Sequence, residues 1–181
     1  RYAADALTSG NCNIAMGINA LGAATTGCDN IAIGQTSMSG AAVTGYDNTY
    51  LGRNSGRDVT SGHNNIGMGK DAGCGVSTGS YNVSLGAFTM NGSGGADHAG
   101  HANVGIGHNT LRVVASGGSN IAIGCDAGVS ITSGCCTVNI GKAANRTATA
   151  TGCISADMYF LGHQNSDCRA KTSIADSDLG L

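Results

Sequence analysis

A repeat of about seventeen residues runs through most of the chain and restricts its possible folds more than any other feature. Each repeat holds a short apolar stretch that ends in glycine, such as "NIAIG", which occurs at residues 30–34 and again at 120–124. We call this last glycine the anchor. The eight anchors are Gly17, Gly34, Gly52, Gly69, Gly86, Gly107, Gly124 and Gly141, spaced by 17 or 18 residues apart from one step of 21. Such a period is typical of solenoids, in which each repeat stacks on the previous one.

The residues before each anchor alternate in character. Those three and one before it are apolar or nearly so, and a residue such as Ala, Gly or Ser stands between them. This period of two predicts a short strand whose apolar side chains share one inward-facing side. A strand this short needs partners, which are the same positions of neighbouring repeats, stacked in parallel about 4.8 Å apart. The sequence therefore predicts an all-β fold, a parallel β-solenoid or β-roll of about eight coils of 17–18 residues. A helical alternative is disfavoured because frequent interior glycines would cost roughly 1 kcal/mol each.

Other columns of the repeat are nearly invariant along the chain. Glycine stands seven residues before every anchor, where a corner needs a positive φ or a close backbone approach. Asparagine stands four residues before seven of the anchors and is predicted to form a ladder of stacked amides. Its members are Asn13, Asn30, Asn48, Asn65, Asn82, Asn103 and Asn120, and Thr137 takes the eighth place. Three residues after the anchor only Ala, Ser or Thr occurs, which predicts tight packing, with another subunit as one candidate partner. A weaker apolar column, ten residues before the anchor, includes Ala42 and is interrupted by Asp97.

The composition indicates that one chain has little core of its own. Among 181 residues there are 31 Gly and no Trp or Pro, and only 4% are aromatic. Burying an aliphatic side chain contributes about 2 kcal/mol, whereas ordering a residue costs roughly 1 to 2 kcal/mol of backbone entropy. A lone coil with two or three aliphatic side chains therefore has a deficit. We expect a homo-oligomer, in particular a homotrimer, in which columns of small residues pack between chains.

Charge and hydropathy disfavour several classes of partner. Lys and Arg number 9 against 11 Asp and Glu, without a basic stripe, so nucleic acid is not expected as a partner. The apolar runs fall well short of the roughly 18 residues that span a bilayer, so membrane insertion is not expected. No catalytic constellation for an external substrate is apparent, so the sequence predicts neither an enzyme of that kind nor a cofactor.

The repeats, with their N-[IV]-A-[IL]-G strands, resemble those of trimeric autotransporter adhesin heads, and still more the longer-period repeats of phage tail fibres. The resemblance covers about residues 7–145. It implies a trimeric, β-structured shaft on a virion or in an extracellular surface filament. The period here is longer than that typical of the adhesin heads.

The C-terminal stretch "NSDCRAKTSIADSDLGL" resembles the opening of the endosialidase-type intramolecular chaperone, which ends many phage tail fibres and spikes. In that family the chain cleaves itself beside a serine after trimerisation. The resemblance implies that Ser166 is the nucleophile and Lys171 its base, with Asp167 and Arg169 as supporting charges, in at most one self-cleavage when the whole domain is present. The alternative is that this stretch is a solvated connector.

These resemblances divide the chain into three parts. Residues 1–145 are expected to form the repetitive shaft. Residues 146–165 are expected to be a connecting segment, and residues 166–181 to be the truncated start of the chaperone-like segment.

Cysteine and histidine supply two further candidate sites. Eight cysteines are present but none in a C-x-x-C pair, so no metal site is predicted. Cys12 and Cys28 stand at nearly equivalent positions of adjacent coils, which predicts a disulfide between them, with buried free thiols as the alternative. Asp97, His98 and His101 lie in the longest repeat and are expected to form a protruding receptor-contact loop. A metal ion held by these histidines on a threefold axis is the less favoured reading.

Two functions follow from these features. The favoured one is a structural shaft of a viral tail fibre or surface filament, which spaces or presents a receptor-binding region. The alternative is a trimeric adhesin that binds host-surface glycans directly through the shaft. Ice binding is disfavoured, because it requires regular rows of Thr-x-Thr and the Ser/Thr column here is single.

Overall fold

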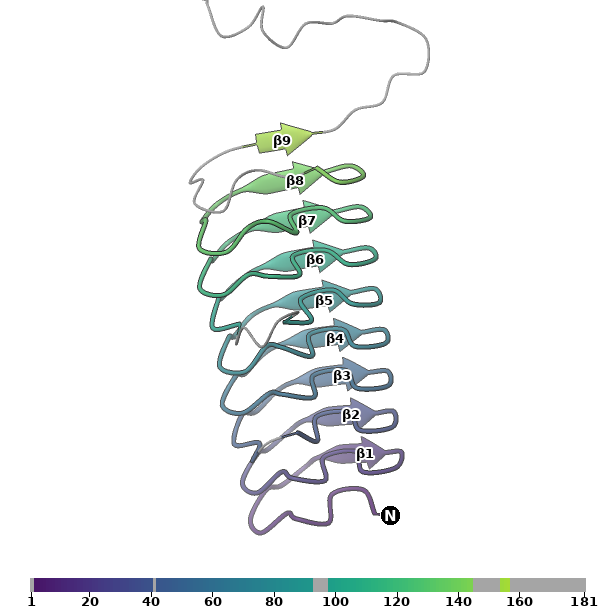
Figure 1. Ribbon diagram of the computed structural model, residues 1–181. Coiled ribbons are helices and arrows are strands. Elements are labelled where there is room, and N and C mark those ends of the chain that lie inside the picture. The colour runs from purple at the N-terminus through teal and green to yellow at the C-terminus, as the bar shows by residue number, and fades with distance from the viewer. Residues whose placement is uncertain (1, 41, 93–97, 145–153, 157–181) are drawn as a thin grey trace, which may run out of the picture.

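The computed structural model describes residues 2–40, 42–92, 98–144 and 154–156. Over these residues the chain winds into a stack of similar coils, and each coil contributes one three-residue strand to a single sheet (Figure 1). The described part contains no helix, and therefore none that is long and apolar enough to cross a membrane. The strands are β1 (Ile14–Met16), β2 (Ile31–Ile33), β3 (Thr49–Leu51), β4 (Ile66–Met68), β5 (Val83–Leu85), β6 (Val104–Ile106), β7 (Ile121–Ile123), β8 (Val138–Ile140) and β9 (Ile154–Ala156).

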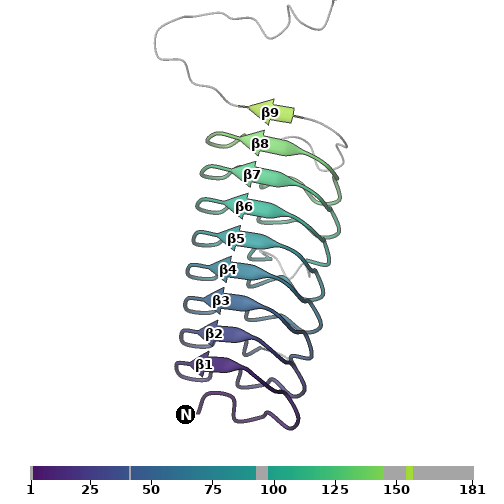
Figure 2. The ribbon, with the colours of Figure 1, turned by 180° about the vertical axis from the view of Figure 1, so that it is seen from behind.

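The sheet confirms the predicted all-β parallel solenoid. Its strands follow one another in sequence order, every neighbouring pair is parallel, and equivalent positions face each other, as Ile14 faces Ile31. Seen from behind, the loops on both sides of the sheet are stacked in the same order as the strands (Figure 2). Strand β9 pairs with β8, so the sheet extends by one strand into residues 146–165, the expected connecting segment.

The orientation of the strands differs from the sequence-based expectation. In β2 to β8 the middle residue is buried, whereas the two flanking residues, which we expected inside, lie half-buried or exposed on the outer face. Alternation identifies which residues share a face but not which face the coil encloses. The coil is narrow, and at this position it encloses Ala, Gly, Ser or Asn, with Tyr50 the one large side chain.

The core is built from columns inside the coil. The Ala, Ser and Thr residues three after each anchor are at most 4% exposed, so they pack within one chain and not between subunits, as we had expected. Their neighbours one residue later are Leu21, Met38, Met90 and Leu111, or glycine. On the opposite side lies the predicted apolar column: Ala24, Val59, Val76, Val114 and Ile131.

The two longest repeats depart from this apolar column. In the repeat of 18 residues Val43 is buried and Ala42 is exposed. In the repeat of 21 residues His98 takes the inward place and pairs with Val76 in an isolated parallel bridge. The additional residues of these repeats shift the inward-facing side chain one position nearer to the anchor.

Glycine serves two different purposes in the coil. The anchors have φ values between +122° and +138°, a region that favours glycine. The glycines seven residues earlier lack a positive φ. Instead, each from Gly10 to Gly117 lies so close to the carbonyl oxygen of its equivalent in the next coil that a Cβ atom would approach it within 3 Å. Both columns are therefore fixed by the stacking of coils.

The predicted asparagine ladder is present and runs through the interior. From Asn48 to Asn120, each Nδ2 donates to Oδ1 of the preceding asparagine at 3.0–3.2 Å. The same Oδ1 accepts the next asparagine's backbone N–H, and Nδ2 also donates to a glycine carbonyl of the following coil, as Asn48 does to Gly62 at 2.8 Å. Thr137 ends the described ladder, where its Oγ1 donates to Asn120 Oδ1 at 2.8 Å. The ladder thus satisfies its buried amides from coil to coil.

Candidate functional site

The outer face of the sheet carries a continuous row of large apolar side chains, which we call the apolar face. It consists of the first and third residues of strands β1 to β8. Eight of these side chains are between 37% and 65% exposed: Ile14, Met16, Ile66, Met68, Ile106, Ile121, Ile123 and Ile140. Parallel sheets are normally covered on both faces, and large exposed apolar patches mark interaction sites. The apolar face is therefore the most extensive candidate interaction surface among the described residues.

The longest repeat does not present its histidines as expected. His98 is 2% exposed and its backbone N–H donates to Gly75 O at 2.8 Å, so its expected role in receptor contact is wrong. The reason is that it occupies the inward position of the apolar column. His101 is exposed, and its Nδ1 accepts the backbone N–H of Ser80 at 3.1 Å. Asp97 lies outside the described residues.

Cys12 and Cys28 are both free thiols, so the disulfide predicted between them is absent. The register explains this, because Ile14 faces Ile31 and the residue level with Cys12 is consequently Asp29, not Cys28. The backbone N–H of Asp29 donates to Asn11 O at 3.0 Å, which fixes the offset. Cys74, Cys125, Cys135 and Cys136 are also free.

Three rings gather on the outside of the coils that contain β3, β4 and β5. Tyr46 and His63 stack with their centroids 4.8 Å apart, and Tyr81 meets His63 edge-on at 5.3 Å. His63 Nδ1 lies 3.0 Å from Ser80 Oγ, which orients the ring. Both tyrosines are exposed, so this ring cluster offers an aromatic surface to solvent.

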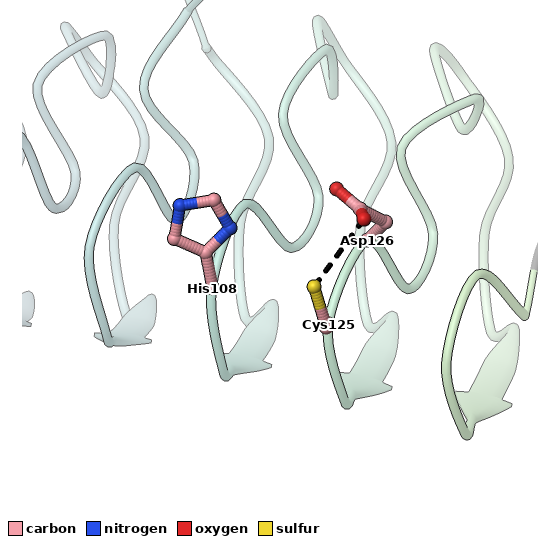
Figure 3. A group of neighbouring side chains, drawn as sticks. All are labelled: His108, Cys125 and Asp126. Carbon is pink, nitrogen blue, oxygen red and sulfur yellow. Dashed lines mark hydrogen bonds between the residues drawn. The ribbon is translucent and has the colours of Figure 1, made fainter.

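A second cluster lies on the loops that follow β6 and β7. His108 is the first residue after the anchor Gly107, and Cys125 and Asp126 are the first two after Gly124. One ligand atom from each of the three residues lies within 4.8 Å of the others, and Figure 3 shows the side chains together on neighbouring coils. Among the described residues no other group of three or more His, Cys, Asp or Glu side chains is so close. Its parts are 17 residues apart in sequence, so only the register of the coils, and not a local motif, brings them together.

Hydrogen bonds tune the two acidic groups of this cluster in opposite directions. Cys125 Sγ donates to Asp126 Oδ2 at 3.3 Å, and this bond, with desolvation and the carboxylate's charge, raises the pKa of Cys125. Asn109 Nδ2 donates to Asp126 Oδ1 at 2.6 Å. The bonds from Asn109 and Cys125 lower the pKa of Asp126. The cluster therefore pairs a protonated thiol with an ionised carboxylate near neutral pH.

The residues predicted for self-cleavage, Ser166 and Lys171 with Asp167 and Arg169, lie outside the described residues, and their role stays a prediction. Comparison of the chain with protein-family models, curated proteins and solved structures finds no match.

Proposed function

We propose that the chain is a shaft segment of a homotrimeric fibre, a viral tail fibre or an extracellular surface filament, which spaces or presents a receptor-binding region. The observation that carries this proposal is the apolar face on a rod of stacked coils. At about 4.8 Å for each strand, the nine strands give a rod roughly 40 Å long. The apolar face follows β1 to β8 along it.

A second copy of the chain fits this face better than an unrelated partner does. A partner that covers the whole face must offer apolar groups that recur at the same spacing along the same length. Another copy has this property by construction, and identical chains commonly associate in closed symmetric rings. The number of three follows from the resemblance of the repeats to trimeric fibre shafts.

Sedimentation equilibrium of the 181-residue chain tests the assembly. We expect a particle three times the 17.8 kDa mass of one chain. The double variant Ile66→Asp, Ile121→Asp places two charges on the apolar face and should sediment as a smaller species, because burying unpaired charges in an interface is strongly unfavourable. A folded wild-type monomer at micromolar concentration would contradict the proposal.

Ile18→Asp is the matched control. Ile18 is 51% exposed, as is Ile14 in the apolar face, but it follows the anchor Gly17 and lies outside the sheet. This variant should keep the wild-type mass. Equal dissociation by Ile18→Asp and by the double variant would show that the apolar face is not the interface.

A second candidate function is direct binding of host-surface glycans by the shaft, and the ring cluster of Tyr46, His63 and Tyr81 favours it. Exposed aromatic rings offer apolar faces together with polar edges. The apolar C–H face of a sugar ring can stack on such a surface, while its hydroxyls remain hydrated or hydrogen-bonded.

Binding of the chain to an array of glycans tests this second candidate. We expect Tyr46→Ala and Tyr81→Ala to abolish any binding, whereas Tyr2→Ala, which removes an exposed tyrosine elsewhere, should leave it unchanged. Absence of binding by the wild-type chain would leave the structural role alone.

A further inference from the structure

The cluster of His108, Cys125 and Asp126 has the composition of a transition-metal site, and the coil geometry explains how it forms. Every coil has the same backbone after its anchor, where the anchor glycine and the residue two positions later have positive φ values. Asp126 N–H donates to His108 O at 3.0 Å, which links the two loops directly. Side chains at equivalent positions are thereby held about one strand spacing, 4.8 Å, apart.

The sequence uses this common backbone differently in each coil. The two positions after the anchor hold Ile18 and Asn19 in the first coil, and Arg53 and Asn54 in the third. Only the loops after Gly107 and Gly124 combine imidazole, thiol and carboxylate groups within 4.8 Å among the described residues. The ligands are thus a local addition to a general scaffold.

We propose that His108, Cys125 and Asp126 bind one divalent transition-metal ion of the zinc class. Nitrogen, sulfur and oxygen donors together suit Zn²⁺, which binds them at about 2.0–2.3 Å in tetrahedral geometry. Ligand atoms around such an ion are roughly 3.4 Å apart, so the three groups need to approach by about 1 Å. His108 and Cys125 are exposed and can do so by side-chain rotation.

The surroundings hold the ligands in suitable directions. The edge of the Phe88 ring meets His108 with centroids 5.7 Å apart, which limits rotation of the imidazole. Asn109 donates to Oδ1 of Asp126, so that Oδ2 remains for the metal. Outer partners of this kind commonly change metal affinity by ten- to a hundred-fold.

Binding replaces a proton by the metal. The Cys125 Sγ–H bond breaks, a sulfur–metal bond forms, and the proton passes to solvent, with no change of oxidation state. Three protein ligands leave the fourth tetrahedral position for water or for a donor from a bound partner. All three ligands belong to one chain, so the site does not depend on the assembly proposed above.

Titration of the reduced 181-residue chain with Co²⁺ and with Zn²⁺ tests the proposal. We expect one ion per chain, and a near-ultraviolet thiolate-to-cobalt charge-transfer band with visible bands of tetrahedral cobalt. Cys125→Ser should abolish the charge-transfer band. His108→Ala and Asp126→Asn should each weaken Zn²⁺ binding, measured by calorimetry, by about ten-fold or more.

The matched controls are Cys12→Ser and His101→Ala, which remove an exposed thiol and an exposed imidazole elsewhere. Both should bind as the wild type does, and circular dichroism should show the same β-structure for every variant. The proposal is overturned if the wild type gives no charge-transfer band, if the band persists in Cys125→Ser, or if the controls weaken binding equally.

Discussion

At the scale of single residues, Tyr50 shows how the narrow coil accommodates a large side chain. It is the largest fully buried side chain, at a position that elsewhere holds Ala, Gly, Ser or Asn. A Cβ atom on Gly56, Gly67 or Gly73 would lie within 3 Å of its ring. The ring therefore fills space that three glycines in two coils leave empty. The sequence did not reveal this fit, because Tyr50 alternates with apolar residues and was assigned to the outer side of the strand.

We expect Gly67→Ala to destabilise the fold by about 1–3 kcal/mol, because the added methyl overpacks the core against Tyr50. The free energy of unfolding from denaturant titration measures this. Gly118→Ala is the control, since other coils carry side chains at the equivalent position, for example His101. In the double variant with Tyr50→Ala the two changes should not be additive. Additive losses would contradict the proposed contact.

Stability should fall in alkaline solution because of Cys74. Burial, followed by the charge of Asp58, raises the pKa of this thiol to about 12. An unfolded thiol ionises near pH 8.5. Its contribution to stability is therefore complete below about pH 8.5 and is lost as the pH rises towards 12, since the unfolded state then releases the proton first. Thermal unfolding at pH 7.5 to 10 checks this, and Cys74→Ala should show a smaller decrease than the wild type.

At the scale of elements, the columns of the repeat were predictable and the side of the strand was not. The asparagine column identified the ladder, because an amide that recurs at the same place in every coil can bond to its copies. The apolar residues of the strands were assigned inward because burial is the usual fate of Ile and Val. In this coil the interior holds the small residues, and the larger aliphatic residues cover the outside of the sheet.

Asn65 stands in the middle of the ladder, and Asn65→Ala should destabilise the fold by about 1–3 kcal/mol. The change leaves Gly79 O and Asn82 without the bonds that the Asn65 side chain makes. Asn65→Thr should lose less, since Thr137 bonds to Asn120 in the same way at the ladder's end. Asn11→Ala, at an exposed position, is the control for both. Equal stability of Asn65→Ala and Asn11→Ala would contradict a stabilising ladder.

At the scale of the whole molecule, the period alone predicted the architecture, since equivalent residues of successive coils are paired throughout the sheet. The cluster of His108, Cys125 and Asp126 escaped prediction for the same reason that the architecture did not. Its residues belong to different columns and different repeats, so their proximity depends on the register and not on sequence spacing. The Cys12–Cys28 disulfide failed on an offset of one residue in that register.

Deletion of residues 108–124 removes one repeat and should leave a folded rod that is one coil shorter. Gly107 then precedes Cys125, as Gly124 does in the intact chain, so the corner keeps its sequence. Circular dichroism should keep its β-type spectrum. Deletion of residues 108–115 should instead abolish cooperative unfolding, because it removes about half a coil and places unlike columns against each other. Equal stability of the two deletions would show that the columns do not determine the stacking.

The parallel, in-register pairing also has a consequence for how such a rod changes over generations. Loss or tandem duplication of one repeat's worth of coding sequence leaves every remaining junction with the same neighbours. The reach of the rod is then a heritable quantity that varies in steps of about 4.8 Å. Selection can adjust it without redesigning the interior.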